Sequence, residues 1–346
     1  MINNGLRIFI IAIITGFIAL AVWLFAKDSM PKSDDVTIRV LESTAPTQWE
    51  LVKKITGRDI LNEEGVKLQF INSFSSSGGT VSLQAILANN IETARSAWPA
   101  WINIIAHGGK LKALLSASVS TKENSVNKTG LLVLEGSNIR TIKDLPGKRI
   151  AVNVLGAEAD YVIRQYLKKN GLSISQVELV VVPGPQQEQM LRTKQVDAVS
   201  FSEMYADMAF ENGGLREIPG TTNFETKGEV VSSAIGFRSD FIEKHPDVVR
   251  RYIRAYDITR RILYDEFQKN PDRIRKAYAD ISVEKGSNPR LAKYYRPTFL
   301  TPGVPFIGDK DIQWWIDRFV EDGLLKPGQI KPSDIYTNEF NPLYKK

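Results

Sequence analysis

Residues 139–172 read IRTIKDLPGKRIAVNVLGAEADYVIRQYLKKNGL, and this stretch decides the fold class. Within it, residues 149–154 form an apolar, β-branched run that predicts a buried strand. From 158 to 169 the apolar side chains fall on one helical face, and Asn170-Gly171 supplies the left-handed stop common at helix ends. A second strand, a short helix and a third strand are predicted before residue 200. This alternation predicts a parallel sheet with helices on its faces.

The remainder of the chain also alternates between strand-like and helix-like patterns, which predicts an α/β protein. Strands are predicted at 36–41, 66–71, 93–97, 111–119, 129–134, 177–182, 196–200 and 230–237. Helices are predicted at 49–60, 98–108 and 186–193, from residue 80 onward, and over most of the chain after residue 239. A length of 346 residues can bury a substantial core and is typical of two lobes.

Charge and composition exclude several function classes. The net charge is +6, but the basic residues are spread among 39 acidic ones. No nucleic-acid partner is therefore expected, and a mild field favouring anionic solutes is the plainer interpretation. The chain has no cysteine, which excludes disulfides, thiolate metal sites, cysteine nucleophiles and a lipid-modified N-terminal cysteine. His107 and His245 lack metal-ligand spacing and no common catalytic motif is present, so we expect no cofactor, no metal and no catalysis.

Residues 1–35 predict a membrane-targeting segment followed by a polar linker. Residues 8–26 carry no charge and follow Arg7. As a helix they would extend about 28 Å, close to the thickness of a hydrocarbon core. Two interpretations stay open: a signal peptide cleaved after a small residue such as Ala26, or a retained anchor in the inner membrane. In both cases the positive flank stays inside and residues 27–346 are exported.

Five motifs, in order along the chain, carry a resemblance to a known family. They are Ser77-Gly78-Gly79-Thr80 followed by Leu83-Gln84-Ala85-Ile86, Asp144-Leu145 with Gly147-Lys148, Gly171-Leu172, Val196-Asp197-Ala198 with Glu203, and the run 240–265. With these motifs, residues 36–340 resemble the solute-binding proteins of ABC importers for sulfonates, taurine, nitrate and thiamine precursors.

The resemblance implies a type II periplasmic-binding-protein fold, with mixed sheets flanked by helices and two lobes that close on a solute. It implies a first lobe at 36–128 and 231–346, a second lobe at 129–230, and two hinge strands near 129–134 and 230–237. It further implies a small-molecule ligand, an ABC permease in the inner membrane as partner, a monomer and a periplasmic location. Two alternatives stay open, a membrane-anchored solute sensor and an enzyme on the same fold.

The candidate site in the first lobe lies where predicted strands end. Its proposed ligand-binding residues are Thr44, Gln48, Trp49, Ser77, Gly78, Gly79, Thr80, Ser96 and Trp98. The loop at 75–80 enters a helix, where amides, hydroxyls and glycines suit an anion such as a sulfonate; an ordinary helix cap is the alternative. An aspartate at Gly79 is expected to abolish binding and leave the fold intact. Trp49 and Trp98 are expected to contact an apolar part of the solute, whereas Trp101 packs inside and Arg95 points outward.

The candidate site in the second lobe consists of Gly156, Ala157, Glu203 and Tyr205. The first two open a predicted helix whose carboxylates at 158 and 160 satisfy its own dipole in the plainer interpretation. Glu203 matches an acid of the family, and Tyr205 is expected to replace an aromatic residue that the family places there. A solute with an anionic head and a donor-bearing end, such as taurine, fits both lobes; the alternative is that Glu203 caps a helix.

Overall fold

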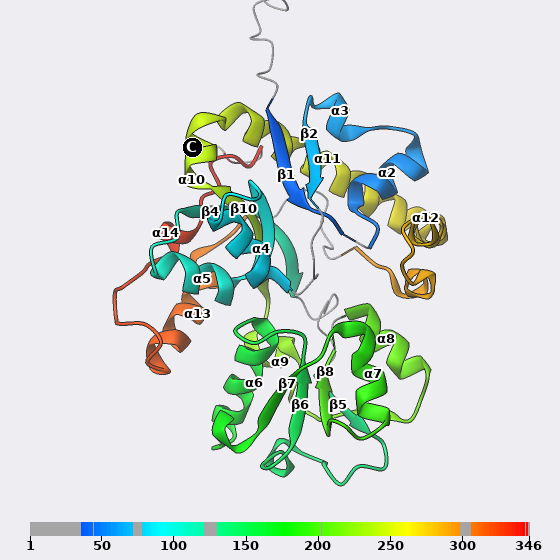
Figure 1. Cartoon of the computed structure of the whole chain (residues 1–346), viewed down its shortest axis with the longest axis vertical. Helices are drawn as coiled ribbons and strands as arrows, with labels where there is room; N and C mark the ends of the chain where they lie inside the picture. Colours follow the sequence, from blue (N-terminus) through cyan, green and yellow to red (C-terminus); the bar gives the residue numbers. More distant parts are fainter. Residues whose placement is uncertain are drawn as a thin grey trace, which may run out of the picture. The chain divides into compact units, whose positions relative to one another are not determined.

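The computed structural model describes residues 36–43, 45–71, 78–120, 130–201, 203–297, 306–342 and 344. These residues form three β-sheets flanked by helices, so the predicted mixed α/β class is confirmed (Figure 1). Within the described ranges, no helix combines the length and the apolar character needed to cross a membrane. The segment 8–26, for which a signal peptide or an anchor is expected, lies outside the described residues.

The largest sheet has five strands in the order β7-β6-β8-β5-β9. Its strands are β5 (Leu131–Leu134), β6 (Arg149–Val152), β7 (Glu178–Val181), β8 (Ala198–Ser200) and β9 (Leu215–Glu217). Strand β6 is parallel to β7 and β8, as the alternation in the sequence predicts. Strand β5 is antiparallel to β8 and β9, and β9 is too short for its pattern to be recognised in advance.

A second sheet has three antiparallel strands in the order β3-β10-β4, and a third has two, β1-β2. Their bounds are β1 (Thr37–Leu41), β2 (Lys67–Ile71), β3 (Thr93–Ala97), β4 (Leu111–Ser120) and β10 (Val230–Arg238). The end of β4 pairs with the start of β10 at Ser120 and Val230. The chain between them contains the five-stranded sheet. Residues 131–134 of the run 129–134, for which a hinge role is predicted, form β5 inside the larger sheet.

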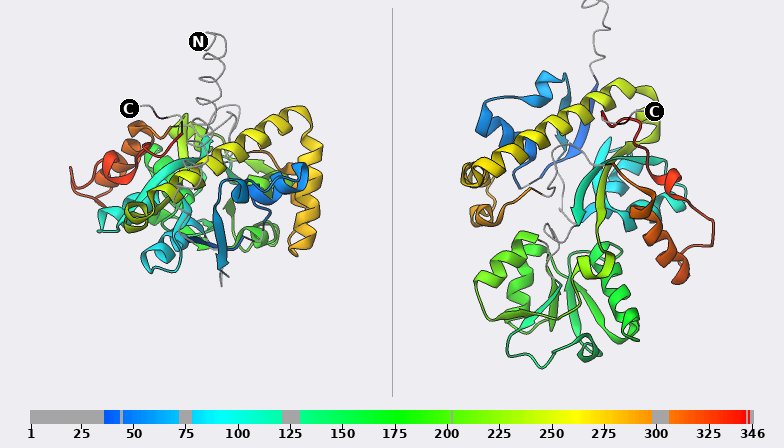
Figure 2. Two further views of the ribbon diagram at one scale, coloured as in Figure 1. Left: turned by 90° about the horizontal axis from the view of Figure 1, so that it is seen from above. Right: turned by 180° about the vertical axis from the view of Figure 1, so that it is seen from behind.

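Helices cover the sheets and carry most of the C-terminal part. They are α2 (Gln48–Thr56), α3 (Ile60–Glu63), α4 (Gly78–Leu87), α5 (Trp98–Ala106), α6 (Glu158–Lys169), α7 (Gly184–Arg192), α8 (Glu203–Glu211), α9 (Asn223–Lys227), α10 (Ser239–Lys244), α11 (Pro246–Lys269), α12 (Pro271–Glu284), α13 (Asp309–Glu321) and α14 (Pro332–Ile335), with 3₁₀ turns η1 (Ile142–Asp144), η2 (Ile174–Gln176) and η3 (Pro289–Tyr294). The long helix α11 contacts α2, α3 and α12 (Figure 2).

One predicted helix ends early, and one helical run is divided into two helices. The helix predicted at 49–60 stops at Thr56, because Gly57 takes a left-handed φ of 74° and caps it. The run 240–265 forms two helices, α10 and α11. Pro246 has no amide hydrogen to continue α10, so it begins α11 instead.

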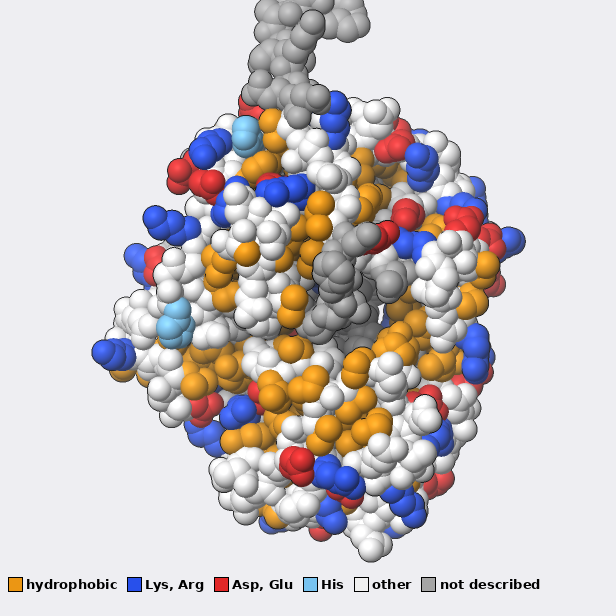
Figure 3. Space-filling model, viewed as in Figure 1, with side chains coloured by type: hydrophobic (Ala, Val, Ile, Leu, Met, Phe, Trp, Pro, Cys, Tyr) orange, Lys and Arg blue, Asp and Glu red, His pale blue; other side chains and the backbone are white. Residues whose placement is uncertain are grey.

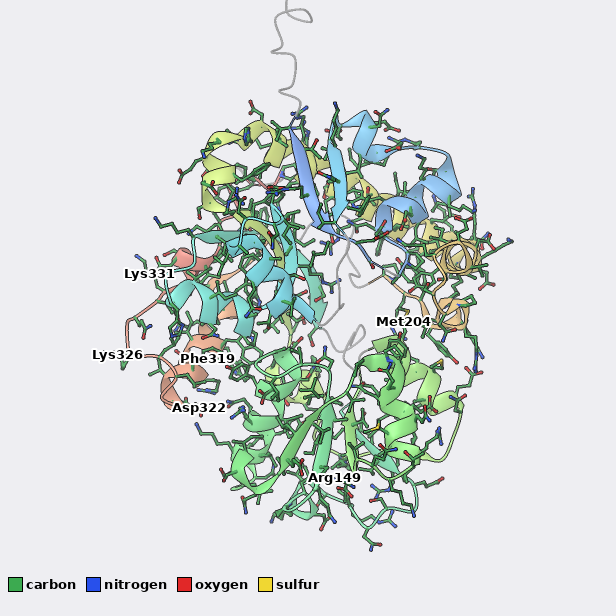
Figure 4. The ribbon with its side chains drawn as sticks, in the orientation of Figure 1. Arg149, Met204, Phe319, Asp322, Lys326 and Lys331 are labelled. Carbon is green, nitrogen blue, oxygen red and sulfur yellow. The ribbon has the colours of Figure 1, made fainter. Side chains whose placement is uncertain are left out.

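One hydrophobic core connects the three-stranded sheet with the five-stranded one. It contains Trp101 of α5, Trp315 and Phe319 of α13, and Tyr166 of α6. Figure 4 shows Phe319 and Asp322 on the side of α13 that faces α6. At this contact the Tyr161 and Phe319 rings lie 4.6 Å apart. Helix α13 therefore packs against α5 and β10, next to the three-stranded sheet, and against α6, next to the five-stranded one.

Candidate functional site

The first turn of α4 lies directly against the end of β3. A Cβ atom at Gly79 would lie 2.2 Å from the Ser96 Oγ and 2.7 Å from the Ser96 Cα. Two of the predicted site residues are thus brought together by a contact that only glycine permits. The expectation that an aspartate at Gly79 leaves the fold intact was wrong, because the new side chain would overlap the backbone of β3.

The other predicted residues of this loop are placed only in part. Ser77 and Thr44 lie outside the described residues, and Gly78 is the first residue of α4. The Thr80 hydroxyl oxygen is buried and has no hydrogen-bond partner among the described residues. Thr80 therefore carries a polar group that this part of the structure does not use.

Helix α2 presents a half-buried indole beside α11. Gln48 opens the helix, after a capping box in which Thr47 and Glu50 exchange hydrogen bonds. The Trp49 ring meets the Tyr256 ring edge-on, with centroids 5.5 Å apart, and the Tyr252 ring at 5.9 Å. This packing fixes the orientation of Trp49 and leaves part of its ring uncovered. Contact between Trp49 and an apolar part of a solute stays a prediction.

Trp98 is placed differently from what we expected. Its side chain is fully buried, and its indole Nε1 donates to the backbone oxygen of Val231 at 2.6 Å. In this structure it offers no surface to a solute; it ties the start of α5 to β10. Trp101 is also fully buried, as predicted for a packing residue, and its Nε1 donates to the Ser96 oxygen at 3.1 Å.

The start of α6 is held by one of its own carboxylates. Gly156 has a φ of 70°, and its amide donates to the Asp160 Oδ2 at 2.9 Å. The other carboxylate oxygen of Asp160 accepts from the Arg164 Nε at 2.7 Å. Ala157 is the N-cap residue and makes no side-chain cap. The carboxylate of Asp160 thus neutralises the N-terminal end of its own helix, as in the plainer of the two interpretations. An external anion therefore gains little at this end of α6.

Glu158 is committed to a buried partner. Its carboxylate bonds the ammonium group of Lys227 on α9, whose side chain is only 1% exposed. The same Nζ lies 5.7 Å from the centre of the Trp315 ring on α13. The pair therefore joins α6, α9 and α13, and it removes Glu158 from the residues available to a solute.

Helix α8 brings Tyr205 against two clusters at once. Glu203 is its first residue. Tyr205 is half-buried between the cluster formed by α2, α11 and α12 and a second cluster beneath β8, and burial raises the pKa of its hydroxyl. Met204 packs against the first of these clusters, and Figure 4 places it at the end of α8 nearest α12. Tyr205 therefore packs against α2, α11 and α12 on one side and against the cluster beneath β8 on the other.

The sequence analysis missed a group of hydroxyls on β4 and β10. The Ser118 Oγ lies 2.6 Å from the Ser233 Oγ and 3.2 Å from the Ser232 Oγ. The Nε of Arg95 on β3 approaches the Ser233 Oγ at 3.4 Å. The signal in the sequence is the recurrence of serine at 116, 118 and 120, which brings hydroxyls to the part of β4 that pairs with the start of β10.

The surface around these elements is apolar. Figure 3 shows hydrophobic side chains gathered around the middle of the face viewed. Trp49, Tyr205 and Met204 are partly buried apolar residues of the helices named above. The serines on β4 and β10 are buried, and apolar residues combined with a few polar groups are typical of the lining of sites for small organic molecules. Within the described residues, no cluster of histidines and carboxylates suits a metal ion.

Comparison with known proteins adds a family and a fold. The family described as NMT1/THI5 like matches residues 61–272. No curated protein matches the chain significantly.

Solved structures of low sequence identity share the fold. The alkanesulfonate-binding protein SsuA from Xanthomonas axonopodis pv. citri, bound to MOPS, has a TM-score of 0.68 at 18% identity, covering 88% of this chain and 99% of that one. The periplasmic aliphatic sulphonate binding protein SsuA from Escherichia coli has 0.65 at 16%, covering 87% and 92%. The desulfurization enzyme DSZB has 0.58 at 15%, covering 88% and 97%. The predicted fold of periplasmic binding proteins is therefore confirmed.

Proposed function

Because this chain belongs to the NMT1/THI5 like family, we propose that it is the solute-binding component of an ABC importer. It captures a small organic solute, of a sulfonate- or taurine-like kind, and delivers it to a membrane permease. The observation that supports this most is the group of hydroxyls at Ser118, Ser232 and Ser233. It lies on β4 and β10, the two paired strands between which the chain runs through the five-stranded sheet.

The proposal includes the division into two lobes. The first consists of 36–128 and 231–346 and the second of 129–230, with a solute cleft between them. A periplasmic location, a monomeric state and a permease partner belong to the same proposal. The enzyme DSZB shares the fold, so an enzyme is the second candidate. The chain has no cysteine, and its two histidines, His107 and His245, belong to no common catalytic motif. Both facts argue against an enzyme.

A thermal-shift screen tests the function directly. The panel contains ethanesulfonate, taurine, MOPS, sulfate, nitrate and a pyrimidine. A ligand that binds only the folded chain stabilises it by about 2.7 kcal/mol at a hundredfold excess over its Kd. We therefore expect at least one organic anion or zwitterion to raise the unfolding temperature clearly. A panel without any shift would contradict a solute-binding role.

Contacts between α8 and η3 give a second test of the proposal. The Asp207 carboxylate accepts from the Arg296 guanidinium at 2.8 Å, and Glu211 bonds both Lys293 and Tyr294. The bond to Glu211 raises the pKa of the Tyr294 hydroxyl to about 12. We call these three bonds the latch. They join helix α8 of the proposed second lobe to η3 and to Arg296, just after η3, in the first, so they contribute only when the lobes are closed.

Removing the two ion pairs of the latch, Arg296–Asp207 and Lys293–Glu211, is expected to weaken solute binding two- to fivefold. The side chains are largely exposed, and exposed ion pairs each contribute about 0.2–1 kcal/mol. Calorimetry on the double variant Arg296→Gln/Lys293→Gln measures the loss. Salt should weaken binding less in the variant than in the wild type, because screening has less to act on. Lys276→Gln, whose partner Asp280 lies in the same helix, is the control. Equal affinities at low and high salt in all three proteins would exclude a closing role.

A further inference from the structure

We propose that Arg95 binds the anionic group of the solute, together with the hydroxyls of Ser118 and Ser233. This inference rests on the proposed function and adds a residue that determines which solutes are bound. It places the anion on the three-stranded sheet, whereas the sequence analysis placed it at the loop before α4 and left Arg95 out. The placement follows from strand register, hydrogen bonds and charge.

The register of β3 and β10 places Arg95 on the hydroxyl-bearing face of the sheet. Ser233 pairs with Ala97, and Ile235 pairs with Arg95, so all four side chains share one face. Ser118 of β4 pairs with Ser233 from the other side. Arg95, the middle residue of β3, therefore lies diagonally across from Ser233 on β10, and its Nε reaches the Ser233 Oγ.

Among the described residues, Arg95 leaves most of its hydrogen-bonding capacity unused. A guanidinium carries five N–H donors in a planar fork. Among the described residues its side chain has one partner, the Ser233 hydroxyl, at the long distance of 3.4 Å. No carboxylate in the described ranges lies within ion-pair distance of it, and the residue is exposed. An arginine whose N–H donors are available suits a planar or tetrahedral oxyanion, which can accept two parallel hydrogen bonds from the guanidinium.

A second, buried guanidinium adds positive charge to the same face. Arg260 of α11 is fully buried, and its Nη1 donates to the Ser116 oxygen at 2.7 Å. Burial, and to a smaller extent the charge of Arg95, lower the pKa of Arg260 to about 10. Arg95 and Arg260 carry like charges that repel each other, and a bound anion beside Arg95 would reduce this repulsion. The nearby Asp257 carboxylate accepts from the Arg261 Nε at 2.8 Å.

The aromatic residues next to this charge suit the organic part of a solute. The Arg260 Cζ lies 5.7 Å from the Tyr256 ring, and the Tyr256 ring lies 5.5 Å from that of Trp49. The site therefore has an anion-binding end at Arg95 and an apolar end at Trp49. An anion with a short apolar tail fits this order better than a bare inorganic ion.

The test compares a charged ligand with a neutral one of the same shape. Binding of ethanesulfonate and of ethanesulfonamide is measured by calorimetry on the wild type and on Arg95→Gln, Arg95→Lys and Arg149→Gln. Arg149 is also an exposed arginine on a strand, and Figure 4 shows it at the far end of the five-stranded sheet. The Arg149→Gln variant therefore changes the net charge equally and serves as the control.

We expect the wild type to bind ethanesulfonate and to bind the sulfonamide much more weakly. A charge-assisted bond to a buried anion is typically worth a factor of about ten to a hundred, so Arg95→Gln should lose that much ethanesulfonate affinity. Arg95→Lys should lose less, and Arg149→Gln should match the wild type. Without ligand, Arg95→Gln should unfold at the same temperature as the wild type or higher, because the repulsion with Arg260 is gone.

Each result separates this inference from the proposed function. If the wild type binds sulfonates and Arg95→Gln binds them equally well, the inference is overturned and the function stands. The same holds if the wild type binds a neutral solute and no anion. If no member of the thermal-shift panel binds the wild type, the proposed function fails and the inference with it. An Arg95→Gln protein that unfolds at a lower temperature than Arg149→Gln would assign Arg95 a structural role and overturn the proposal.

Discussion

Replacing Glu158 with glutamine is expected to lower the free energy of unfolding by about 3 kcal/mol. The substitution leaves the ammonium group of Lys227 buried, at 1% exposure, without its carboxylate. The Trp315 ring, 5.7 Å from the Nζ, compensates only a part of the lost interaction. Chemical denaturation followed by tryptophan fluorescence measures the difference, since the buried tryptophans of the core, Trp315 among them, become exposed on unfolding.

The two partners of the pair should behave unequally. Glu158 keeps 22% exposure, so in Lys227→Met its carboxylate is still partly solvated and the loss should be smaller. The double variant Glu158→Gln/Lys227→Met leaves no buried charge and should recover most of the stability. If Glu158→Gln is no worse than Lys227→Met, the pair does not hold α6, α9 and α13 together in the way that the structure indicates.

Replacing Gly79 with alanine is expected to destabilise the fold by up to about 3 kcal/mol. The added Cβ overlaps the Ser96 Oγ at 2.2 Å, and the Ser96 Cα at 2.7 Å prevents relief by a simple rotamer change. Helix α4 or strand β3 must therefore shift. We expect the midpoint of chemical denaturation to fall, and solute affinity to fall with it, because β3 also carries Arg95.

Gly136→Ala is the matched control for this prediction. A Cβ at Gly136 would meet no atom within 4 Å, and the residue lies in the turn after β5. The midpoint of Gly136→Ala should equal that of the wild type within error. Equal midpoints for the two variants would show that the close approach of Gly79 to Ser96 is not needed for the fold.

The role of Gly79 changes how a loss of binding in this region should be interpreted. A substitution there acts through the packing of α4 on β3, so it does not report on direct contact with a solute. Arg95→Gln is the cleaner probe, because Arg95 is exposed and its single bond among the described residues is long. The two variants together separate a structural loss of binding from a chemical one.

The elements with the strongest local signals were predicted well. Helix α6 begins and ends at the predicted residues, because its apolar face is periodic and Asn170-Gly171 provides a left-handed stop. The three parallel strands β6, β7 and β8 were predicted because each is a β-branched run between turn residues. The class, α/β with mixed sheets and the binding-protein fold, follows from this alternation and the motifs around it.

The sequence by itself determined the α/β class, the periodic helices, the parallel strands and the absence of cysteine chemistry, since these depend on residues close together in the chain. The tertiary structure alone decided which polar groups meet. Trp98 lies in the core because its indole reaches Val231, 133 residues away. Glu158 pairs with Lys227, and Ser118 with Ser233, across separations of 69 and 115 residues. A local pattern cannot show such pairs, because they depend on strand register and helix packing. The same is true of the electrostatic repulsion between Arg95 and Arg260.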